Sequence, residues 1–459
     1  MPGSNQLRNI PSVTEVLEGC LKEGWSATYS REQIVEAVRE ALSAMREELI
    51  DKGAAGTDLL GAVRRRLESM TRPSLRRVIN ASGIIVHTNL GRAPLAREAL
   101  ARIAELSGYD NLEFDLESGE RGSRESHLEK FFRRLIPAEA SLVVNNNAAA
   151  LLLILNTFAE GKEVLVSRGE LVEIGGSFRL PEIMKKSGAT LCEVGTTNKT
   201  RVQDYRNAIN ERTGLILAVH PSNFRMIGFT EHPTLRELIA LGKERAIPVV
   251  QDHGSGVLVD LQTFGIADEP TVSQNLLEGL DAICFSGDKI LGGPQAGIVC
   301  GKKVWIEKMR ANPLFRAFRV SKMVYAALEA TLLLHLRNPM EGIPVLSMLA
   351  QSEAQLKERG TAWLSELKAR IPSATFELVA SECFIGGGVA PMKGLASWAV
   401  AVSHPSMNAK ELAFSLRRSE PPVVARIEAD RVFLEIRTIT AAEQAEITSA
   451  LEQMLPKHS

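Results

Sequence analysis

The chain has 459 residues, enough for more than one domain with a large core. Its 54 basic and 55 acidic residues nearly cancel, so no overall charge draws it toward nucleic acid or membranes. The five cysteines form no C-x-x-C pair, which argues against a disulfide framework or a zinc site. With no signal peptide and no apolar run long enough to cross a bilayer, the sequence predicts a soluble, cytoplasmic protein.

Residues 1–78 predict a separate helical domain. Apolar residues recur at helical spacing over 34–42, and Ser30 with a glutamine three residues later matches a capping box. A second helix is predicted over 58–70. Six arginines between residues 64 and 77 form a basic cluster with one nearby acid. Charge alone leaves two interpretations of this cluster open, contact with phosphates or a solvated helix face.

From residue 79 the pattern changes to short apolar segments that alternate with helical stretches. Strands are predicted at 141–145, 163–167, 190–195, 214–220, 247–252, 282–286 and 296–301. Helical segments between them, such as 233–245, predict a largely parallel sheet covered on both faces. Ligands of such sheets bind at the carboxyl ends of the strands, so the functional residues should follow the strands directly.

Lys289 follows one of these predicted strands, in the stretch FSGDKILGGPQAG at 285–297. Gly292, Gly293 and Gly297 leave little side-chain bulk around it and so predict room for a flat cofactor. A sheltered amine of this kind suits a Schiff-base lysine, because desolvation disfavours its ammonium form. The alternative is a surface lysine that Asp288 neutralises.

Two other strand ends carry matching chemistry. Three asparagines, residues 145–147, open the helix predicted over 148–158 and form either an anion site or plain N-caps. Asp252 closes another strand before a glycine turn, where it either holds a pyridinium proton or forms an Asx-turn. An anion site, an acid and a lysine at one sheet edge together predict a site for pyridoxal phosphate.

Further polar groups cluster near predicted strand ends and in neighbouring loops. They are His87, Arg92, Arg121, Arg124, Thr196, Thr197, His220, Asn223, Arg316 and Arg319. Their number predicts a second anion besides the cofactor phosphate. No metal-binding motif accompanies them, and no metal site is predicted.

The C-terminal part predicts a smaller α/β domain. Residues 408–418 and 441–455 have helical patterns. Residues 421–427 and 431–437 form a predicted hairpin that turns at 428–430. This part carries no chemical motif, so it is expected to pack over the large domain and to make dimer contacts.

Five blocks of the chain resemble bacterial L-seryl-tRNA(Sec) selenium transferases, the selenocysteine synthases. They are INASGIIVHTNLGRAPL (79–95), NNNAAA (145–150), SRGELVEIGGSFRLP (167–181), EVGTTNKT (193–200) and FSGDKILGGPQAG (285–297). The resemblance covers almost the whole chain. It implies the α/β, aspartate-aminotransferase-like fold (fold type I) of pyridoxal-phosphate enzymes. The domains would be a helical tRNA-binding domain over 1–78, a large cofactor-binding domain over 79–339 and a small domain over 340–459.

The resemblance also implies an activity. Members convert L-seryl-tRNA(Sec) to L-selenocysteinyl-tRNA(Sec) with selenophosphate, through a dehydroalanyl-tRNA intermediate on pyridoxal 5'-phosphate. They form homodecamers of five dimers with active sites between subunits. On this basis RNA contact becomes the favoured interpretation of the basic cluster. The alternatives are a small-molecule β-eliminating lyase of the same superfamily, which has no need of residues 1–78, and a non-catalytic RNA-binding scaffold.

The resemblance implies a role for each matching residue. Lys289 would be the Schiff-base lysine and general base, Asp252 would face the ring nitrogen, and Asn146, Asn147 and Ser286 would hold the cofactor phosphate. Thr196, Thr197, Arg316 and Arg319 would bind selenophosphate, and His87, Arg92 and Asn223 would line the same pocket. One departure is His253, where the family pattern has leucine. It places a titratable group directly after Asp252.

Overall fold

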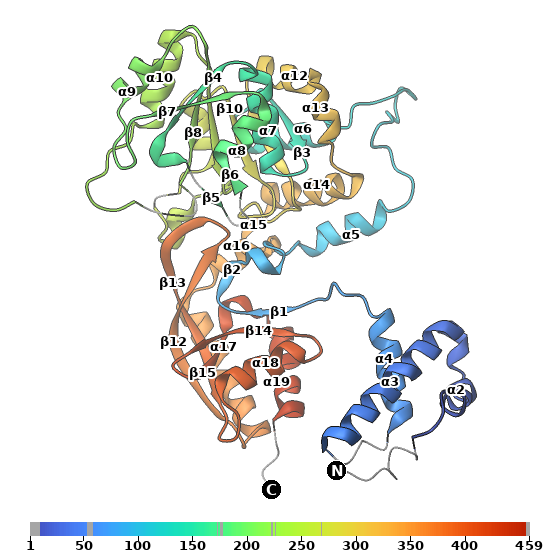
Figure 1. Cartoon of the computed structure of the whole chain (residues 1–459). Coiled ribbons are helices and arrows are strands. Elements are labelled where there is room, and N and C mark those ends of the chain that lie inside the picture. The colour runs from blue at the N-terminus through green and yellow to red at the C-terminus, as the bar shows by residue number, and fades with distance from the viewer. Residues whose placement is uncertain are drawn as a thin grey trace. The chain divides into compact units, whose positions relative to one another are not determined.

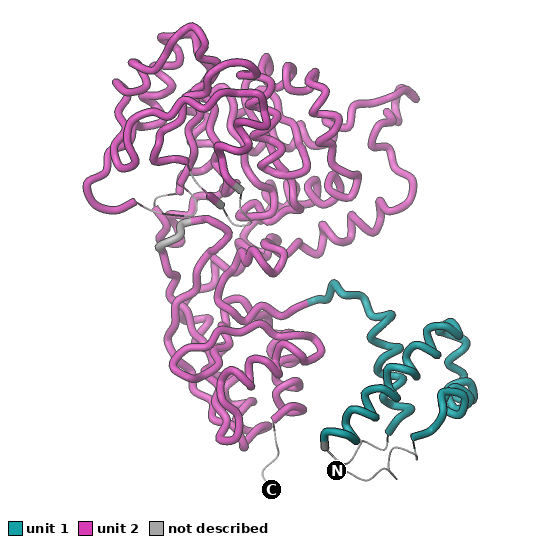
Figure 2. The backbone as a smooth tube through the Cα atoms, in the orientation of Figure 1, with its two compact units in different colours: residues 1–77 teal, residues 78–459 magenta. Residues whose placement is uncertain are grey.

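The computed structural model describes residues 10–52, 58–171, 173–174, 178–221, 224, 226–267 and 269–455. Two compact units divide the chain, residues 1–77 and 78–459 (Figure 2). Within the described ranges, no helix combines the length and apolar character needed to cross a membrane.

The first unit is helical, as its sequence predicts. Its elements are α2 (Val13–Lys22), the short η1 (Trp25–Ala27), α3 (Arg31–Lys52) and α4 (Leu59–Thr71). The predicted capping box is confirmed: Gln33 N–H donates to Ser30 Oγ at 3.2 Å, and Ser30 N–H donates to Gln33 Oε1 at 2.8 Å. Buried Ile34, Val38 and Leu67 belong to the core that joins these helices.

The second unit contains a seven-stranded sheet, which lies in the upper part of Figure 1. Its order is β3-β11-β10-β9-β8-β4-β7. The strands are β3 (Ala140–Val144), β4 (Glu163–Ser167), β7 (Thr190–Val194), β8 (Thr213–Val219), β9 (Val249–Gly254), β10 (Ala282–Ser286) and β11 (Gly297–Gly301). β11 runs antiparallel to both neighbours, and the other pairings are parallel. All seven predicted strands are therefore confirmed, in one largely parallel sheet.

Helices cover both faces of this sheet, as predicted. One face packs against α7 (Asn147–Ala159), α8 (Leu180–Ser187), α12 (Lys303–Ala311) and α13 (Pro313–Ala317). The other packs against α6 (Ser126–Leu135), α9 (Val202–Ala208), α10 (Leu235–Arg245), α11 (Val272–Leu277) and α14 (Lys322–Arg337). Strands β3 and β4 are buried along their whole length, which explains their continuous apolar runs.

A second sheet has the order β1-β14-β15-β13-β12-β2. Its strands are β1 (Ile79–Ala81), β2 (Ile84–Val86), β12 (Thr375–Gly386), β13 (Val389–Ser403), β14 (Val423–Glu428) and β15 (Arg431–Glu435). α17 (Glu353–Arg370), α18 (Ala409–Arg418) and α19 (Ala441–Met454) pack on it. The predicted hairpin is confirmed: Glu428 pairs with Arg431, and Ala429 and Asp430 have φ of 46° and 55°.

Two features of this sheet differ from the sequence prediction. The boundary at residue 79 assigns β1 and β2 to the large domain, but they pair with β14 and β12. The long strands β12 and β13 were not predicted. β1 and β2 have only three residues each, so they carry no periodic signal. Their partner strands lie some 300 residues away along the chain, so only tertiary pairing places β1 and β2 in this sheet.

Short elements connect these parts. They are η2 (Thr88–Leu90), α5 (Arg97–Glu105), η3 (Arg168–Glu170), β5 (Glu173–Ile174), β6 (Phe178–Arg179), η4 (Leu261–Phe264), α15 (Pro339–Gly342), α16 (Pro344–Ala350) and η5 (Ile436–Thr438). β5 and β6 form an antiparallel pair. The segment with η2 follows β2 and leads toward the carboxyl edge of the large sheet, where the predicted site residues gather.

Candidate active site

Lys289 lies just beyond the carboxyl end of β10, a central strand of the large sheet. Its side chain is half-buried. Burial lowers the pKa of Lys289 from its ordinary value, although nearby Asp252 and Asp288 favour the charged form. A lysine with a lowered pKa holds more free amine at neutral pH, as a nucleophile toward an aldehyde requires.

Asp288 does not serve as the counterion that the surface-lysine alternative requires. Its buried carboxylate accepts a hydrogen bond from Arg92 Nη1 at 2.6 Å. The backbone N–H of Ala93 also donates to Asp288 O at 3.2 Å. These contacts fasten the segment after β2 to the lysine loop, so Arg92 lies near Lys289.

His87 lies in the same segment. Its Nδ1 accepts a hydrogen bond from Asn89 N–H at 3.2 Å. Burial lowers the pKa of His87, which favours the neutral ring. A ring whose Nδ1 is an acceptor is poorly suited to donate a proton from that atom.

Asp252 is a buried carboxylate on β9, the strand next to β10. Its Oδ1 accepts a hydrogen bond from Asn147 Nδ2 at 2.8 Å. Burial raises the pKa of Asp252, while Asn147 and the charge of Lys289 oppose this rise. Asn147, Asp252 and Lys289 therefore lie together at one edge of the sheet.

Asn146 and Asn147 have different hydrogen-bond partners, which the sequence did not reveal. Asn146 is the N-cap of α7, and its Oδ1 accepts a hydrogen bond from Ala149 N–H at 2.9 Å. Asn147 orients Asp252. The backbone N–H groups of α7 that precede Ala149 have no partner within the helix, so they are the groups available to an anion. Ser286 ends β10 opposite Gly297.

The glycines after Lys289 have a different role from the one predicted. A Cβ at Gly297 would lie 2.1 Å from Asn146 O, and one at Gly292 would lie 2.3 Å from a methyl carbon of Ile343. The expected space is thus filled by protein. These glycines let β11 approach the start of α7 and let the lysine loop pack closely against its neighbours.

Thr196 and Thr197 follow β7, the edge strand of the sheet. Four strand spacings separate β7 from β10, which is about 19 Å. Thr196 Oγ1 donates to Lys199 O at 2.9 Å and so closes a local turn. Within one chain, the sheet therefore does not bring these threonines to Lys289.

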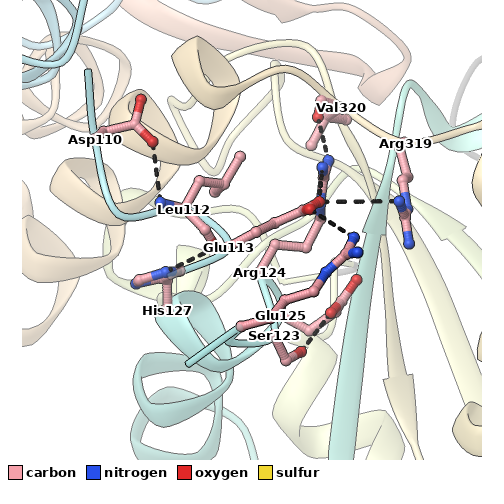
Figure 3. A network of polar contacts seen from close by, with 10 residues as sticks. Asp110, Leu112, Glu113, Ser123, Arg124, Glu125, His127, Arg319 and Val320 are labelled. Carbon is pink, nitrogen blue, oxygen red and sulfur yellow. Dashed lines mark hydrogen bonds and ion pairs between the residues drawn. The ribbon is translucent and has the colours of Figure 1, made fainter. Parts of the chain in front are cut away.

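Arg319 belongs to a network of arginines around one carboxylate, Glu113 (Figure 3). Arg124 Nε donates to Glu113 Oε1 at 2.9 Å, and Arg121 Nη2 donates to Oε2 at 2.9 Å. Arg319 Nη1 lies 3.9 Å from Oε1. The hydrogen bond from Arg124 is the main cause that lowers the pKa of Glu113. Three guanidinium groups thus lie near the Glu113 carboxylate, and Asp110 and Glu125 belong to the same network.

Two other residues were predicted to line the anion site. Arg316 is on α13, three residues before Arg319. Asn223 lies outside the described residues. Sequence reasoning did not single out Glu113, because nothing in its local sequence marks it as a partner of Arg319.

His253 does not place a charge beside Asp252. Its Nε2 lies 2.8 Å from Pro270 O, and its Nδ1 lies 3.0 Å from Ser255 Oγ. Burial is the main cause that lowers the pKa of His253 to about 4, so the ring is neutral at pH 7. The departure from the family pattern is therefore a neutral, hydrogen-bonded ring.

The residues at this edge suit the cofactor that the sequence predicts. Lys289 offers an amine of lowered pKa, Asp252 offers a buried acceptor for a ring N–H, and the start of α7 offers donors for a phosphate. Asn147 Oδ1 is buried and has no hydrogen-bond partner among the described residues, which leaves one acceptor facing this region. No cluster of described residues matches a metal site.

Comparison with known families covers nearly the whole chain. The profile of the family described as L-seryl-tRNA selenium transferase matches residues 78–440. A second profile, described as selenocysteine synthase N terminal, matches residues 7–46.

Individual proteins agree. The L-seryl-tRNA(Sec) selenium transferase of Aquifex aeolicus is 46% identical over 452 residues, which cover 98% of this chain and 99% of that one. The protein of the same name from Geobacter sulfurreducens is 45% identical, over 97% and 98% of the two chains. The solved structure of D-glucosaminate-6-phosphate ammonia-lyase superposes with a TM-score of 0.58 at 20% identity, over 83% of this chain and 95% of that one. This last likeness shows a shared fold.

Proposed function

The chain belongs to the L-seryl-tRNA selenium transferase family, and we propose that it converts L-seryl-tRNA(Sec) to L-selenocysteinyl-tRNA(Sec) with selenophosphate and pyridoxal 5'-phosphate. The observation that carries this proposal is the half-buried Lys289 beside the buried Asn147–Asp252 pair. This arrangement lies at the carboxyl ends of the strands, where α/β sheets bind ligands.

The chain's own groups have distinct tasks. Pyridoxal phosphate, when bound, supplies an electron sink for the charge that develops at Cα. Lys289 Nζ would hold the cofactor and would accept the Cα proton. Asp252, oriented by Asn147, holds a proton on the ring nitrogen, and the first N–H groups of α7 hold the phosphate.

The second substrate is a small anion with charge on several oxygens. Arg319 in the network around Glu113, Arg316 three residues before it and Arg92 near Lys289 supply guanidinium groups that suit such an anion. Thr196 and Thr197 lie too far from Lys289 within one chain. Their predicted role therefore rests on the expected decamer, in which active sites lie between subunits.

We assign tRNA binding to residues 1–77, with recognition mainly of RNA shape and backbone. The support is the basic cluster near α4. Part of this charge is paired, because Arg64 lies 2.9 Å from Glu68 and Arg66 lies 3.7 Å from Glu40. The assignment predicts steep salt dependence of tRNA binding.

The direct test is conversion of radiolabelled seryl-tRNA(Sec) by the purified protein with selenophosphate and pyridoxal phosphate. Seryl-tRNA(Ser) is the control. We expect selenocysteinyl product from the first substrate alone. Cofactor binding without any product from seryl-tRNA(Sec) would overturn the proposal and favour the small-molecule lyase.

A further inference from the structure

A histidine–carboxylate pair lies at the same edge of the sheet as Lys289. His220 directly follows β8, and Glu269 lies just before α11. His220 Nε2 is 3.0 Å from Glu269 Oε2, and Glu269 is only 6% exposed. Burial raises the pKa of Glu269, but the hydrogen bond and charge of His220 outweigh this and hold it below its usual value. Glu269 is therefore ionised at pH 7.

An ionised carboxylate at this distance orients an imidazole and stabilises positive charge on it. With Nε2–H directed at Glu269, Nδ1 is the ring nitrogen left to another molecule, and it carries a proton to give when the ring is an imidazolium. This is the geometry by which a carboxylate prepares a histidine for proton transfer. Glu269 would thus act through His220, as a positioning residue.

His220 lies close to the groups of the proposed site. Its backbone N–H donates to Asp252 O at 2.9 Å, because β8 and β9 are adjacent parallel strands. The charge of His220 is also among the causes that oppose the raised pKa of Asp252. His220 also lines a cavity of about 290 Å³ together with Glu170 and Gln251.

The other histidines near this edge are less suited to donate a proton. The His253 ring stacks on His220, with centroids 5.3 Å apart and planes 12° apart. His253 is neutral and occupied by Pro270 and Ser255. His87 accepts the N–H of Asn89 at Nδ1, and no ion pair with a carboxylate is found for its ring among the described residues. Of these three rings, His220 is the one with a carboxylate partner.

The reaction proposed above needs such a donor, because hydroxide is a poor leaving group. We propose that His220, oriented by Glu269, protonates the hydroxyl group that leaves the seryl moiety of the tRNA. Lys289 takes the Cα proton, and the electron pair of the Cα–H bond forms the Cα=Cβ bond. The Cβ–O bond breaks with its electrons on oxygen, and the Nδ1 proton of His220 turns that oxygen into water. His220 regains its proton from solvent.

This inference rests on the proposed function, and a change of leaving group separates the two. Chloride leaves without a proton, so tRNA(Sec) charged with β-chloroalanine bypasses the acid. For wild type, H220Q and E269Q, elimination is measured from seryl- and chloroalanyl-tRNA(Sec) without selenophosphate. The ratio of the two rates in each variant does not depend on the fraction of protein that folds.

We expect this ratio, seryl over chloroalanyl, to fall about 100-fold or more in H220Q, the usual contribution of general acid catalysis. E269Q should lower the ratio in the same direction. E278Q is the matched control, because half-buried Glu278 makes a similar pair with Arg236 at 2.7 Å, away from the proposed site. Its ratio should equal that of wild type.

The outcomes are distinct. An unchanged ratio in H220Q, whether both rates fall equally or neither falls, would overturn the assignment of His220 and leave the proposed function intact. An unchanged ratio in E269Q alone would overturn the positioning role of Glu269. If the wild-type protein with bound cofactor eliminates neither group, the proposed function fails and the assignment of His220 fails with it.

Discussion

Glu170 makes the stability of the protein depend on pH in a way that a single substitution should remove. It lies on η3 after β4, and its Oε2 accepts a hydrogen bond from Val219 N–H at 2.9 Å. Burial raises the pKa of Glu170 from 4.5 to about 8. The carboxyl group is therefore mostly protonated in the folded protein at pH 7, although it would be ionised in the unfolded chain.

The sign follows from proton binding. Below pH 4.5 both states hold the proton, and Glu170 costs nothing. As pH rises from 4.5 to about 8, the unfolded chain releases the proton first, so the folded state loses stability. The full pKa shift corresponds to a loss of about 5 kcal/mol in folding free energy, at roughly 1.4 kcal/mol per pH unit. Solvent in the cavity beside Glu170 screens the charge and reduces the expected loss to about 2 kcal/mol.

The substitution E170Q keeps a neutral side chain at every pH. The thermal midpoint of E170Q minus that of wild type should therefore rise between pH 5.5 and pH 8.5. About 2 kcal/mol corresponds to roughly 2 °C for a unit of this size. Scanning calorimetry at several pH values measures the difference, and other titrating groups cancel in it.

E278Q is the control for this measurement. The hydrogen bond from Arg236 lowers the pKa of half-buried Glu278, so that group stays ionised throughout the pH window. The difference in thermal midpoint between E278Q and wild type should therefore not change with pH. If the midpoint of E170Q minus that of wild type also does not change with pH, the reasoning is wrong, because Glu170 would then ionise at the same pH in the folded and unfolded states.

Three further predictions concern the site itself. Lys289→Ala should abolish both the absorbance of lysine-linked cofactor and turnover, and retained turnover would disprove its role. Asn147→Leu should leave the carboxylate of Asp252 without the hydrogen bond from Asn147 and lower the stability of the protein by about 1–3 kcal/mol. It should also weaken cofactor binding in a spectroscopic titration, and an unchanged affinity would show that this bond is dispensable. Gly297→Ala should destabilise the protein by about 1–3 kcal/mol in thermal unfolding, because the added Cβ meets Asn146 O. Gly108 has open space around it, so Gly108→Ala should leave the thermal midpoint unchanged. Equal midpoints for the two variants would contradict the packing argument.

Much of the architecture could be predicted from the sequence, since the signals are local. Apolar runs bounded by turn residues gave all seven strands of the large sheet, including β10 before Lys289. The capping box at Ser30 and the hairpin at 428–430 depend on neighbours within a few residues, so they too were predicted correctly. The family motifs identified the family for the same reason, because each is one continuous block.

The tertiary structure alone decided which distant groups meet. Asn147 bonds Asp252 across 105 residues, Arg92 bonds Asp288 across 196, and His220 meets Glu269 across 49. It also assigned β1 and β2 to the C-terminal sheet and left Thr196 at the far edge of the large one. Periodicity and turn chemistry report on a residue's neighbours along the chain. A hydrogen bond or a buried charge depends on neighbours in space, which only the folded chain supplies.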